Sequence, residues 1–450
     1  MELALLGHMG RDEAVAERLH GHTLHIIGQW ENPGLVYKAI ASNGSFHAVD
    51  SITDAALIAD IVQDIKPDMF LTNFDDALAS GVVDAIKQRV DQRRIPDLLI
   101  PCPDKQASKI EWDKFYLRAI INEINPVYNP LNFMTETPEQ VHEAVKYFED
   151  SGIEIVVKPR NLTGGKGVKV MGKHLHTFEE GRNYALQVLE ADNQEGVEIQ
   201  EKLDGHEFTL QIFTDGTTMI RPPATYDYPY REDGDSGPGT GGMGDFSMQD
   251  GLMPFVTEAD YEEAMTLMGQ VLTSLKEKSH DYKGVLYPTF FKTDKGLKIV
   301  EVNARGGDPE LINVVDLIDD DVDFVEVLRL IALGELTEDA VRYKKLASAM
   351  VYLVSPDYGY RQGPAYEFGI NPNAVAANNC SLRFAAAERI SLNRFKTVGS
   401  SRTVGLSSNG ETPWVARHNI HAAIREGFDK PLLLNFREQV AEKAYIDKLH

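Results

Sequence analysis

Residues Asp233–Phe246, with the sequence DGDSGPGTGGMGDF, hold six glycines and three aspartates. So few side chains cannot build a hydrophobic core, and the pattern is too specific for a spacer. Because glycine has no Cβ atom, a glycine-rich backbone can approach a ligand or another segment closely. The stretch therefore predicts a loop that lies against a bound molecule.

The segments on both sides of this stretch have the pattern of an α+β unit. Strands are expected at 196–203 and 207–216, a long helix at 258–279, and two further strands at 284–293 and 297–307. Two more helices are expected upstream. One covers 105–124, and the other begins after Thr137, has Gln140 for a capping box and ends at Gly152.

The first hundred residues alternate short apolar runs with helical patterns. This alternation is typical of βαβ units, in which ligands bind at the carboxyl ends of parallel strands. The turn GHMGRDEA at 7–14 holds Gly7 and Gly10, with Arg11 opening the helix. Two glycines at this spacing are a weak phosphate-binding signal, and a plain tight turn is an equal alternative. From about Leu346 onward, short strands and turns predict a small closing domain.

The composition excludes several classes of protein. Among 450 residues, 45 Lys and Arg stand against 69 Asp and Glu, a net charge of −24 without a dense basic run, so we expect no nucleic acid partner. No stretch is apolar enough to span a membrane, and the N-terminus lacks the features of a signal peptide. Two distant cysteines, Cys102 and Cys380, support neither a disulfide framework nor a zinc site. We expect a cytoplasmic protein.

A lysine and a glycine loop predict contacts with phosphate. Lys158 lies on an expected strand, and Gly164, Gly165, Lys166 and Gly167 follow it. Backbone N–H groups of such a loop can surround phosphate oxygens while lysines neutralise them. The motif is not a P-loop, which needs Ser or Thr after Gly-Lys and then a helix. A glycine-rich hairpin with an incidental lysine is the alternative.

The stretch IVEVNARGGDPE at 299–310 predicts a metal site. On a strand, Glu301, Asn303 and Arg305 point to one face, because alternate side chains share a side. A carboxylate and an amide oxygen suit Mg²⁺, whose coordination nucleotide phosphates complete. Arg305 can hold an anionic intermediate through two hydrogen bonds. The alternative is a solvated strand face with an ion pair.

Taken together, these motifs resemble the ATP-grasp ligases, and most closely the phosphoribosylamine–glycine ligase family. The family's GPNTGGMG and EFNCRFGDPE are nearly reproduced at 237–244 and 301–310, and its GSGGREHA and GGRVLGVTA are similar to the segments at 7–14 and 400–412. The likeness covers essentially the whole chain. It implies activation of the glycine carboxylate by the γ-phosphate of ATP, attack by 5-phosphoribosylamine, and release of glycinamide ribonucleotide, ADP and phosphate in purine biosynthesis.

The resemblance also implies roles for individual residues. It gives Arg305 and Lys158 to catalysis, and Glu301 and Asn303 to Mg²⁺, with Mn²⁺ as the alternative metal. The residues implied to bind ATP are Lys158, Gly164, Gly165, Lys166, Gly167, Gln200, Glu201, Leu203 and Glu207, together with either Lys109 or Lys114. The residues implied to bind the substrates are Gly10, Arg11, Asp75, Asp227, Gly241, Gly242, Met243, Gly244, Asp308, Pro309 and Glu310.

Departures from the family pattern gather on the substrate side. They are Met9, Glu13, Asp75, Ala77, Pro229, Tyr230, Gly239, Ala304 and Gly306. The family has a lysine and an arginine in the segment at 227–230, and Arg231 is one place removed from the arginine. A related ATP-grasp ligase with another acid or amine, and a non-catalytic nucleotide-binding descendant, therefore stay open as alternatives.

The predicted architecture is an α/β and α+β multidomain protein. A Rossmann-like substrate domain is expected at 1–104, an ATP-grasp domain at 105–335 with a small subdomain at about 127–203, and a mixed α/β domain at 336–450. The expected partners are small molecules only, and the expected assembly is a monomer or weak dimer.

Overall fold

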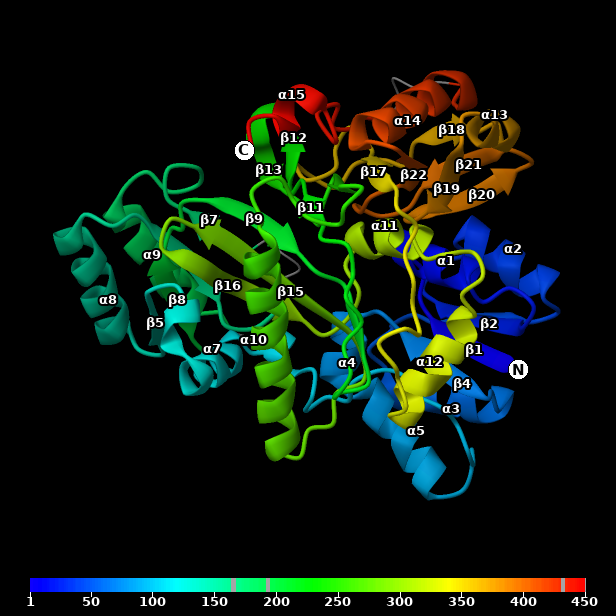
Figure 1. Ribbon diagram of the computed structural model, residues 1–450, viewed down its shortest axis with the longest axis horizontal. Helices are drawn as coiled ribbons and strands as arrows, with labels where there is room; N and C mark the ends of the chain where they lie inside the picture. Colours follow the sequence, from blue (N-terminus) through cyan, green and yellow to red (C-terminus); the bar gives the residue numbers. More distant parts are fainter. Residues whose placement is uncertain (163–166, 192–194, 430–433, 450) are drawn as a thin grey trace.

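A computed structural model describes residues 1–162, 167–191, 195–429 and 434–449. The chain begins with a parallel four-stranded sheet in the order β3-β2-β1-β4 (Figure 1). Its strands are β1 Glu2–Leu6, β2 Thr23–Gly28, β3 Phe46–Ala48 and β4 Met69–Thr72. The helices of this part are α1 Gly10–Glu17, α2 Pro33–Ala41, α3 Ala55–Ile65, α4 Asp75–Ser80 and α5 Val82–Asp91. The predicted parallel sheet is confirmed.

A separate lobe, at the left of Figure 1, is an antiparallel sheet in the order β5-β8-β6-β7 with two helices. Its elements are β5 Asn132–Thr135, α8 Pro138–Ser151, β6 Ile155–Pro159, β7 Lys169–Val170, α9 Phe178–Leu189 and β8 Val197–Glu201. The predicted cap is present, because Thr137 accepts from the Gln140 backbone and Gly152 ends the helix with φ +65°. Apolar side chains of this lobe form a cluster distinct from the main core.

The central part of the chain pairs β15 with three other strands. These elements are β9 His206–Thr209, β10 Ile212–Thr214, β15 Gly284–Thr293 and β16 Gly296–Asn303, with the long helix α10 Glu258–Glu277. The prediction of a single strand at 207–216 is wrong, because this segment forms two strands, β9 and β10. The gap faces Pro288 on β15, which has no N–H to donate and so interrupts the ladder.

The helix expected at 105–124 is likewise two helices, α6 Lys109–Trp112 and α7 Lys114–Ile124. Asp113 between them is extended and caps α7, because its Oδ1 accepts from the backbone N–H groups of Phe115 and Tyr116. The same carboxylate pairs with Arg160 at 2.9 Å, which holds the break in place. Further elements here are η1 Pro126–Tyr128, α11 Glu310–Asp316 and α12 Phe324–Leu333.

The last sheet joins the middle of the chain to its end, in the order β11-β14-β17-β22-β19. Its strands are β11 Tyr226–Asp227, β14 Gly244–Ser247, β17 Ala347–Leu353, β19 Cys380–Phe384 and β22 Val404–Gly410. Around it lie β18 Glu367–Gly369, α13 Pro372–Ala377, β20 Ala387–Ser391, β21 Arg394–Thr397, α14 Pro413–Gly427 and α15 Lys443–Ile446. The predicted domain limits at 104 and 335 stay predictions.

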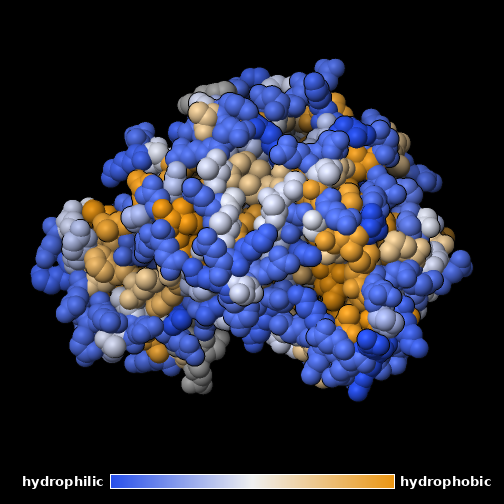
Figure 2. Space-filling model, turned by 60° about the horizontal axis from the view of Figure 1, so that its bottom comes forward, coloured by the Kyte–Doolittle hydropathy of each residue, from blue (hydrophilic) through white to orange (hydrophobic). Residues whose placement is uncertain are grey.

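The glycine-rich stretch is less of a loop than the sequence suggested. Its first half forms the one-turn helix η2 Asp233–Asp235 and the strand β13 Ser236–Gly239, which pairs with β12 Tyr230–Glu232. Its end is β14, so only residues 240–243 remain as a loop. The surface seen in Figure 2 is mainly hydrophilic, in keeping with the net charge of −24. Within the described ranges, no helix is long and apolar enough to cross a membrane.

Candidate active site

Lys158 on β6 and Lys114 at the start of α7 share acidic neighbours. Lys158 on β6 is buried, lies opposite Glu198 of β8 in the strand register, and interacts electrostatically with Glu301 and Lys114. Burial lowers the pKa of Lys158 to about 8, and Glu198 opposes that shift. Burial also lowers the pKa of Lys114, again opposed by Glu301 and Glu198. Both ammonium groups are therefore placed to meet an anion.

The structure distinguishes the two candidates for the second lysine. Lys109 pairs with Asp113 at 3.6 Å and stacks over the rings of Trp112 and Tyr116. Lys114, in contrast, donates to the Asn161 carbonyl at 3.5 Å and shares the acidic neighbours of Lys158. The geometry thus favours Lys114 as the second phosphate-binding lysine.

A buried ion pair joins these lysines to the central sheet. The Arg118 Nε donates to Glu198 Oε1 at 2.5 Å, and both side chains are almost fully buried. The remaining donors of Arg118 reach the carbonyls of Ile299 and Val300 on β16, at 3.0 and 2.8 Å. Arg118 therefore fixes the strand that carries Glu301 against the lobe that carries Lys158.

Gln200, Glu201 and Leu203, which the resemblance implies bind ATP, lie at the end of β8 or just beyond it. Gln200 is buried, and its side-chain oxygen accepts from Arg118 at 3.3 Å, so that side chain is used within the protein. Glu201 accepts from the Leu131 N–H at 2.8 Å, and Leu203 is half-buried in the coil that follows. Gln200 and Glu201 lie in the β8 ladder between β5 and β6, and the N–H groups of Glu201 and Lys202 donate to the carbonyls of Leu131 and Glu154 at 2.8 and 2.7 Å.

Glu301 and Asn303, the pair predicted to bind a metal ion, lie near the end of β16. Asn303 Nδ2 donates to Glu301 Oε1 at 3.2 Å, and Arg305 donates to Asn303 Oδ1 at 3.5 Å. Glu301 is exposed, so its carboxylate is open to a ligand. Across the described residues, no three His, Cys, Asp or Glu side chains group as a metal cage. Two protein oxygens completed by phosphates are the arrangement that Mg²⁺ uses in nucleotide sites, so the residues fit that ion.

Two buried arginines face each other beside this pair. Arg11 on α1 and Arg305 just beyond β16 both donate to the Gly306 carbonyl, at 2.9 and 3.2 Å. Arg305 also lies 3.7 Å from Asp75 on α4 and 3.2 Å from Glu111 on α6. The Nε atoms of both arginines are buried without a hydrogen-bond partner within the described chain. Five other arginines of the described chain also have a buried Nε atom without a hydrogen-bond partner, so these atoms do not by themselves mark a ligand site.

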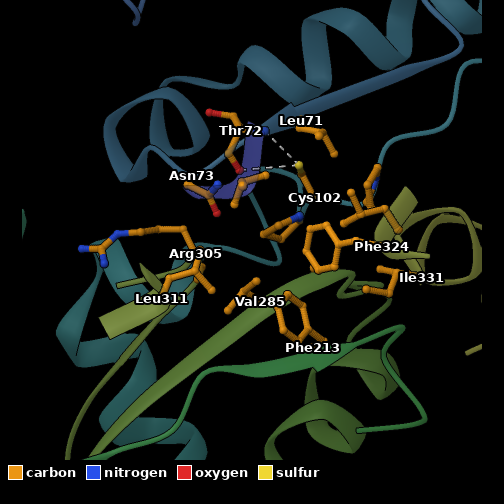
Figure 3. Close-up of a pocket in the computed structure, with 16 residues that line it drawn as sticks. Leu71, Thr72, Asn73, Cys102, Phe213, Val285, Arg305, Leu311, Phe324 and Ile331 are labelled. Carbon is orange, nitrogen blue, oxygen red and sulfur yellow. Dashed lines mark hydrogen bonds between the residues drawn. The ribbon is translucent and has the colours of Figure 1, made fainter. Parts of the chain in front are cut away.

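Behind Arg305 lies a small enclosed cavity of about 30 Å³, lined mainly by apolar side chains (Figure 3). In Figure 3 the guanidinium of Arg305 points away from it, while Thr72 N–H donates to Cys102 Sγ at 3.3 Å on its wall. Such a volume holds one or two water molecules. The cavity is therefore too small to hold a nucleotide or a sugar phosphate.

The residual loop at 240–243 is held from the C-terminal side. Arg402 donates to the carbonyls of Gly241 and Asp308, and lies 3.4 Å from the Asp308 carboxylate. Tyr352 on β17 donates to the other Asp308 oxygen. Gly242 has φ +99°, and a Cβ there would stand 2.6 Å from Pro309. Gly244 begins β14, and the Met243 carbonyl just before it accepts from the Tyr352 N–H at 2.8 Å.

Asp227, Glu207 and Glu310 act on one another electrostatically, and Asp227 lies beside Gly242 of this loop. Burial and neighbouring acids raise the pKa values of Asp227 and Glu310 above their ordinary range, and raise that of Glu207 on β9 to about 8. Glu310 accepts from Tyr287 at 2.8 Å. A cationic or amine group bound here would find acceptors that the protein leaves partly unmatched.

Glu13, one of the departures from the family pattern, and its neighbour Asp12 are both engaged in contacts within the protein. Glu13 accepts from the Phe384 N–H at 2.7 Å and lies 3.7 Å from Lys38, so it points toward α2 and β19. Asp12 accepts from the backbone N–H groups of His8 and Met9, which satisfies the start of α1. These two acids are bound within the protein.

Arg231 is not a local substitute for the family's arginine in the substrate site. It is buried, and it donates to the carbonyls of Ser355 and Pro356 at 3.3 and 3.0 Å. Gly164, Gly165 and Lys166 lie outside the described residues, and the Gly167 carbonyl accepts from Tyr184 at 2.7 Å.

Sequence reasoning missed part of the site. Glu111, Arg118, Glu198, Tyr287, Tyr352 and Arg402 all contact predicted site residues or their neighbours. Arg402 lies inside the family-like segment at 400–412, so that segment was the available signal. The others sit in segments whose local pattern reads only as helix or strand.

Comparison with known proteins identifies the class of this fold and site as the ATP-grasp ligases. Residues 113–311 match the family model described as phosphoribosylglycinamide synthetase, ATP-grasp (A) domain. The crystal structure of phosphoribosylamine–glycine ligase from Thermotoga maritima superimposes with a TM-score of 0.74 at 22% identity, over 97% of this chain and 99% of that one. A biotin carboxylase domain from Hydrogenobacter thermophilus, solved with MgADP and bicarbonate, gives a TM-score of 0.69 at 14% identity, over 99% and 95%.

Relatives in sequence show which family of ATP-grasp ligases this chain belongs to. Phosphoribosylamine–glycine ligase of Pyrococcus furiosus is 31% identical over 91% of this chain and 89% of its own length. That of Pyrococcus abyssi is 30% identical over 100% and 96%. The chain belongs to the phosphoribosylamine–glycine ligase family, and it is an ATP-dependent ligase. The fold class and the family expected from the motifs are confirmed.

Proposed function

We propose that this chain joins glycine to 5-phosphoribosylamine at the expense of ATP, using the residues gathered around Asn303. The observation that carries the proposal is the convergence of three groups at one place. These are the lysine pair Lys114 and Lys158, the oxygen pair Glu301 and Asn303, and the buried Arg305. Membership of the ligase family supports the choice of substrates.

In the first step a glycine carboxylate oxygen attacks the γ-phosphorus of ATP, the bond to the β-phosphate oxygen breaks, and glycyl phosphate and ADP form. Lys158 and Lys114 offset negative charge on the phosphates, which is the main demand of phosphoryl transfer. Glu301 and Asn303 would hold Mg²⁺, which supplies charge neutralisation when bound. The H. thermophilus domain, which holds MgADP, supports this choice of ion.

In the second step the amine of phosphoribosylamine attacks the acyl carbon, phosphate leaves, and the new amide nitrogen loses a proton. Arg305 would hold the acyl phosphate beside the loop at 240–243, where the missing Cβ atoms of Gly241 and Gly242 leave room for Arg402 and Pro309 to hold the loop in place. Arg11 and Gly10 would meet the sugar phosphate at the start of α1. The roles of Asp75, Asp227, Asp308, Pro309 and Glu310 in the substrate site, and of the loop at 164–167 over ATP, also remain part of the proposal.

The test is product formation by the purified protein with MgATP, glycine and freshly generated phosphoribosylamine. Phosphate release and glycinamide ribonucleotide are expected only when both substrates are present. Phosphate release that does not depend on glycine would overturn the proposal. Lys158→Met should abolish turnover, while Lys146→Met, at an exposed ion pair on α8, is the matched control.

We also propose a cytoplasmic protein that acts as a monomer or weak dimer. Both cysteines are buried and free, which suits a reducing compartment. Light scattering after size-exclusion chromatography over a range of protein concentrations would measure the mass in solution. A mass above that of a dimer at low concentration would contradict this assembly.

A further inference from the structure

Arg305 is held by a carboxylate that no motif points to. Glu111 on α6 is almost fully buried, and its Oε1 lies 3.2 Å from an Arg305 nitrogen. Its other oxygen accepts from the Ala304 N–H at 2.7 Å. The Glu111 carboxylate thus accepts a hydrogen bond from the backbone beside Arg305 and also pairs with the Arg305 guanidinium. These two contacts fix the direction of the Arg305 side chain.

Arg305 also forms an ion pair with Asp75, and this pair is weaker than the one with Glu111. Asp75 lies 3.7 Å from the guanidinium and is 23% exposed, whereas the Glu111 side chain is 3% exposed. A buried ion pair is screened less by water and salt than a partly exposed one. Glu111 therefore decides where the guanidinium points, and Asp75 is the position to which it would turn if Glu111 lost its charge.

We propose that Glu111 is a positioning residue for the ligase reaction, which directs Arg305 toward the acyl phosphate. The inference rests on the proposed role of Arg305 in binding that intermediate. Glu111 itself meets no substrate, since both its oxygens are turned to residues 304 and 305. Its loss should therefore lower kcat more than it weakens ATP binding.

The charge on Glu111 should make the reaction rate depend on pH. Burial raises the pKa of Glu111 to about 7, with Arg305 as the main opposing group. As the pH falls through that value, the carboxylate gains a proton and no longer holds the guanidinium by charge. The other charged or titratable groups that act on Glu111, or on which it acts, are Asp75, Arg11, Lys114 and Tyr282.

The decisive variant is Glu111→Gln, which keeps an oxygen acceptor for Ala304 but removes the charge. We expect kcat to fall at least tenfold while the Kd for ATP stays within twofold. The wild-type rate should decline below about pH 7, and that decline should be absent in Glu111→Gln. Glu111→Asp should restore part of the rate. The matched control is Glu123→Gln. Glu123 lies on α7 and forms an exposed ion pair with Lys278, so this variant should keep the wild-type kcat and pH profile.

A crystal structure of Glu111→Gln supplies a readout that does not need turnover. We expect the Arg305 guanidinium to move toward Asp75. An unmoved Arg305, or a wild-type kcat in Glu111→Gln, would overturn the inference even if the wild-type enzyme makes glycinamide ribonucleotide. If the wild-type enzyme made none, the proposed function would fail, and the position of Arg305 in the variant would still decide the role of Glu111.

Discussion

The depressed pKa of Lys158 predicts that ATP binding weakens as the pH rises. With a pKa of about 8, the free enzyme holds this proton in roughly nine molecules of ten at pH 7 and in roughly one of ten at pH 9. ATP phosphates favour the ammonium form, so the neutral form must take up a proton when ATP binds. The Kd for MgATP should therefore rise about tenfold between pH 7 and pH 9.

Isothermal titration calorimetry of MgATP across this range would measure the change. Repeating the pH 9 titration in buffers of different ionisation enthalpy should reveal uptake of close to one proton. In Lys158→Arg the arginine stays charged from pH 7 to pH 9, so the Kd for MgATP should change much less than tenfold over this range. A constant Kd in the wild type, or the same tenfold change in Lys158→Arg, would refute the reasoning. Lys114 is present in both proteins, so its own titration cancels in the comparison.

Three further perturbations follow from other contacts. Arg118→Met leaves the Glu198 carboxylate buried without its main partner, so the free energy of unfolding measured by chemical denaturation should fall by about 3–5 kcal/mol. Adding Glu198→Leu to this variant should recover most of the lost stability, because the buried charge is then removed. Equal losses in the single and the double variant would contradict this account. Gly242→Ala, at φ +99° with no room for a Cβ, should lower both the melting temperature and turnover, while Gly239→Ala, in open space, should change neither. Glu301→Gln should raise the Mg²⁺ concentration for half-maximal rate at least tenfold, and an unchanged Mg²⁺ titration would remove Glu301 from the metal site.

Local patterns predicted the features that depend on neighbours in sequence. Alternation along 297–303 placed Glu301 and Asn303 on one side of a strand, and the cap at Thr137 follows from residues within one helical turn. The break at Asp113 was missed, although its signal is local. An aspartate is a common N-cap, and here Arg160 holds it in that role.

Long-range contacts left no comparable signal. Glu111 reads as an ordinary polar residue of a helix, and its importance comes from Ala304 and Arg305, far along the chain. In the same way, nothing local predicts that Arg402 reaches the loop at 240–243, or that β14 joins a sheet with β17. Such pairings depend on tertiary packing, which overrides what each segment prefers alone.

The pairing of β14 with β17 has a consequence for how this enzyme is made. A ribosome releases β14 well before it releases β17 and Arg402, the partners that hold the adjoining glycine loop. While the chain is still being translated, the lobe that carries Lys158 can fold around its own apolar cluster, but the glycine loop at 240–243 has no partner. A nascent chain therefore cannot complete the site before Arg402 has emerged, and a chain cut short ahead of that point would be an inactive fragment.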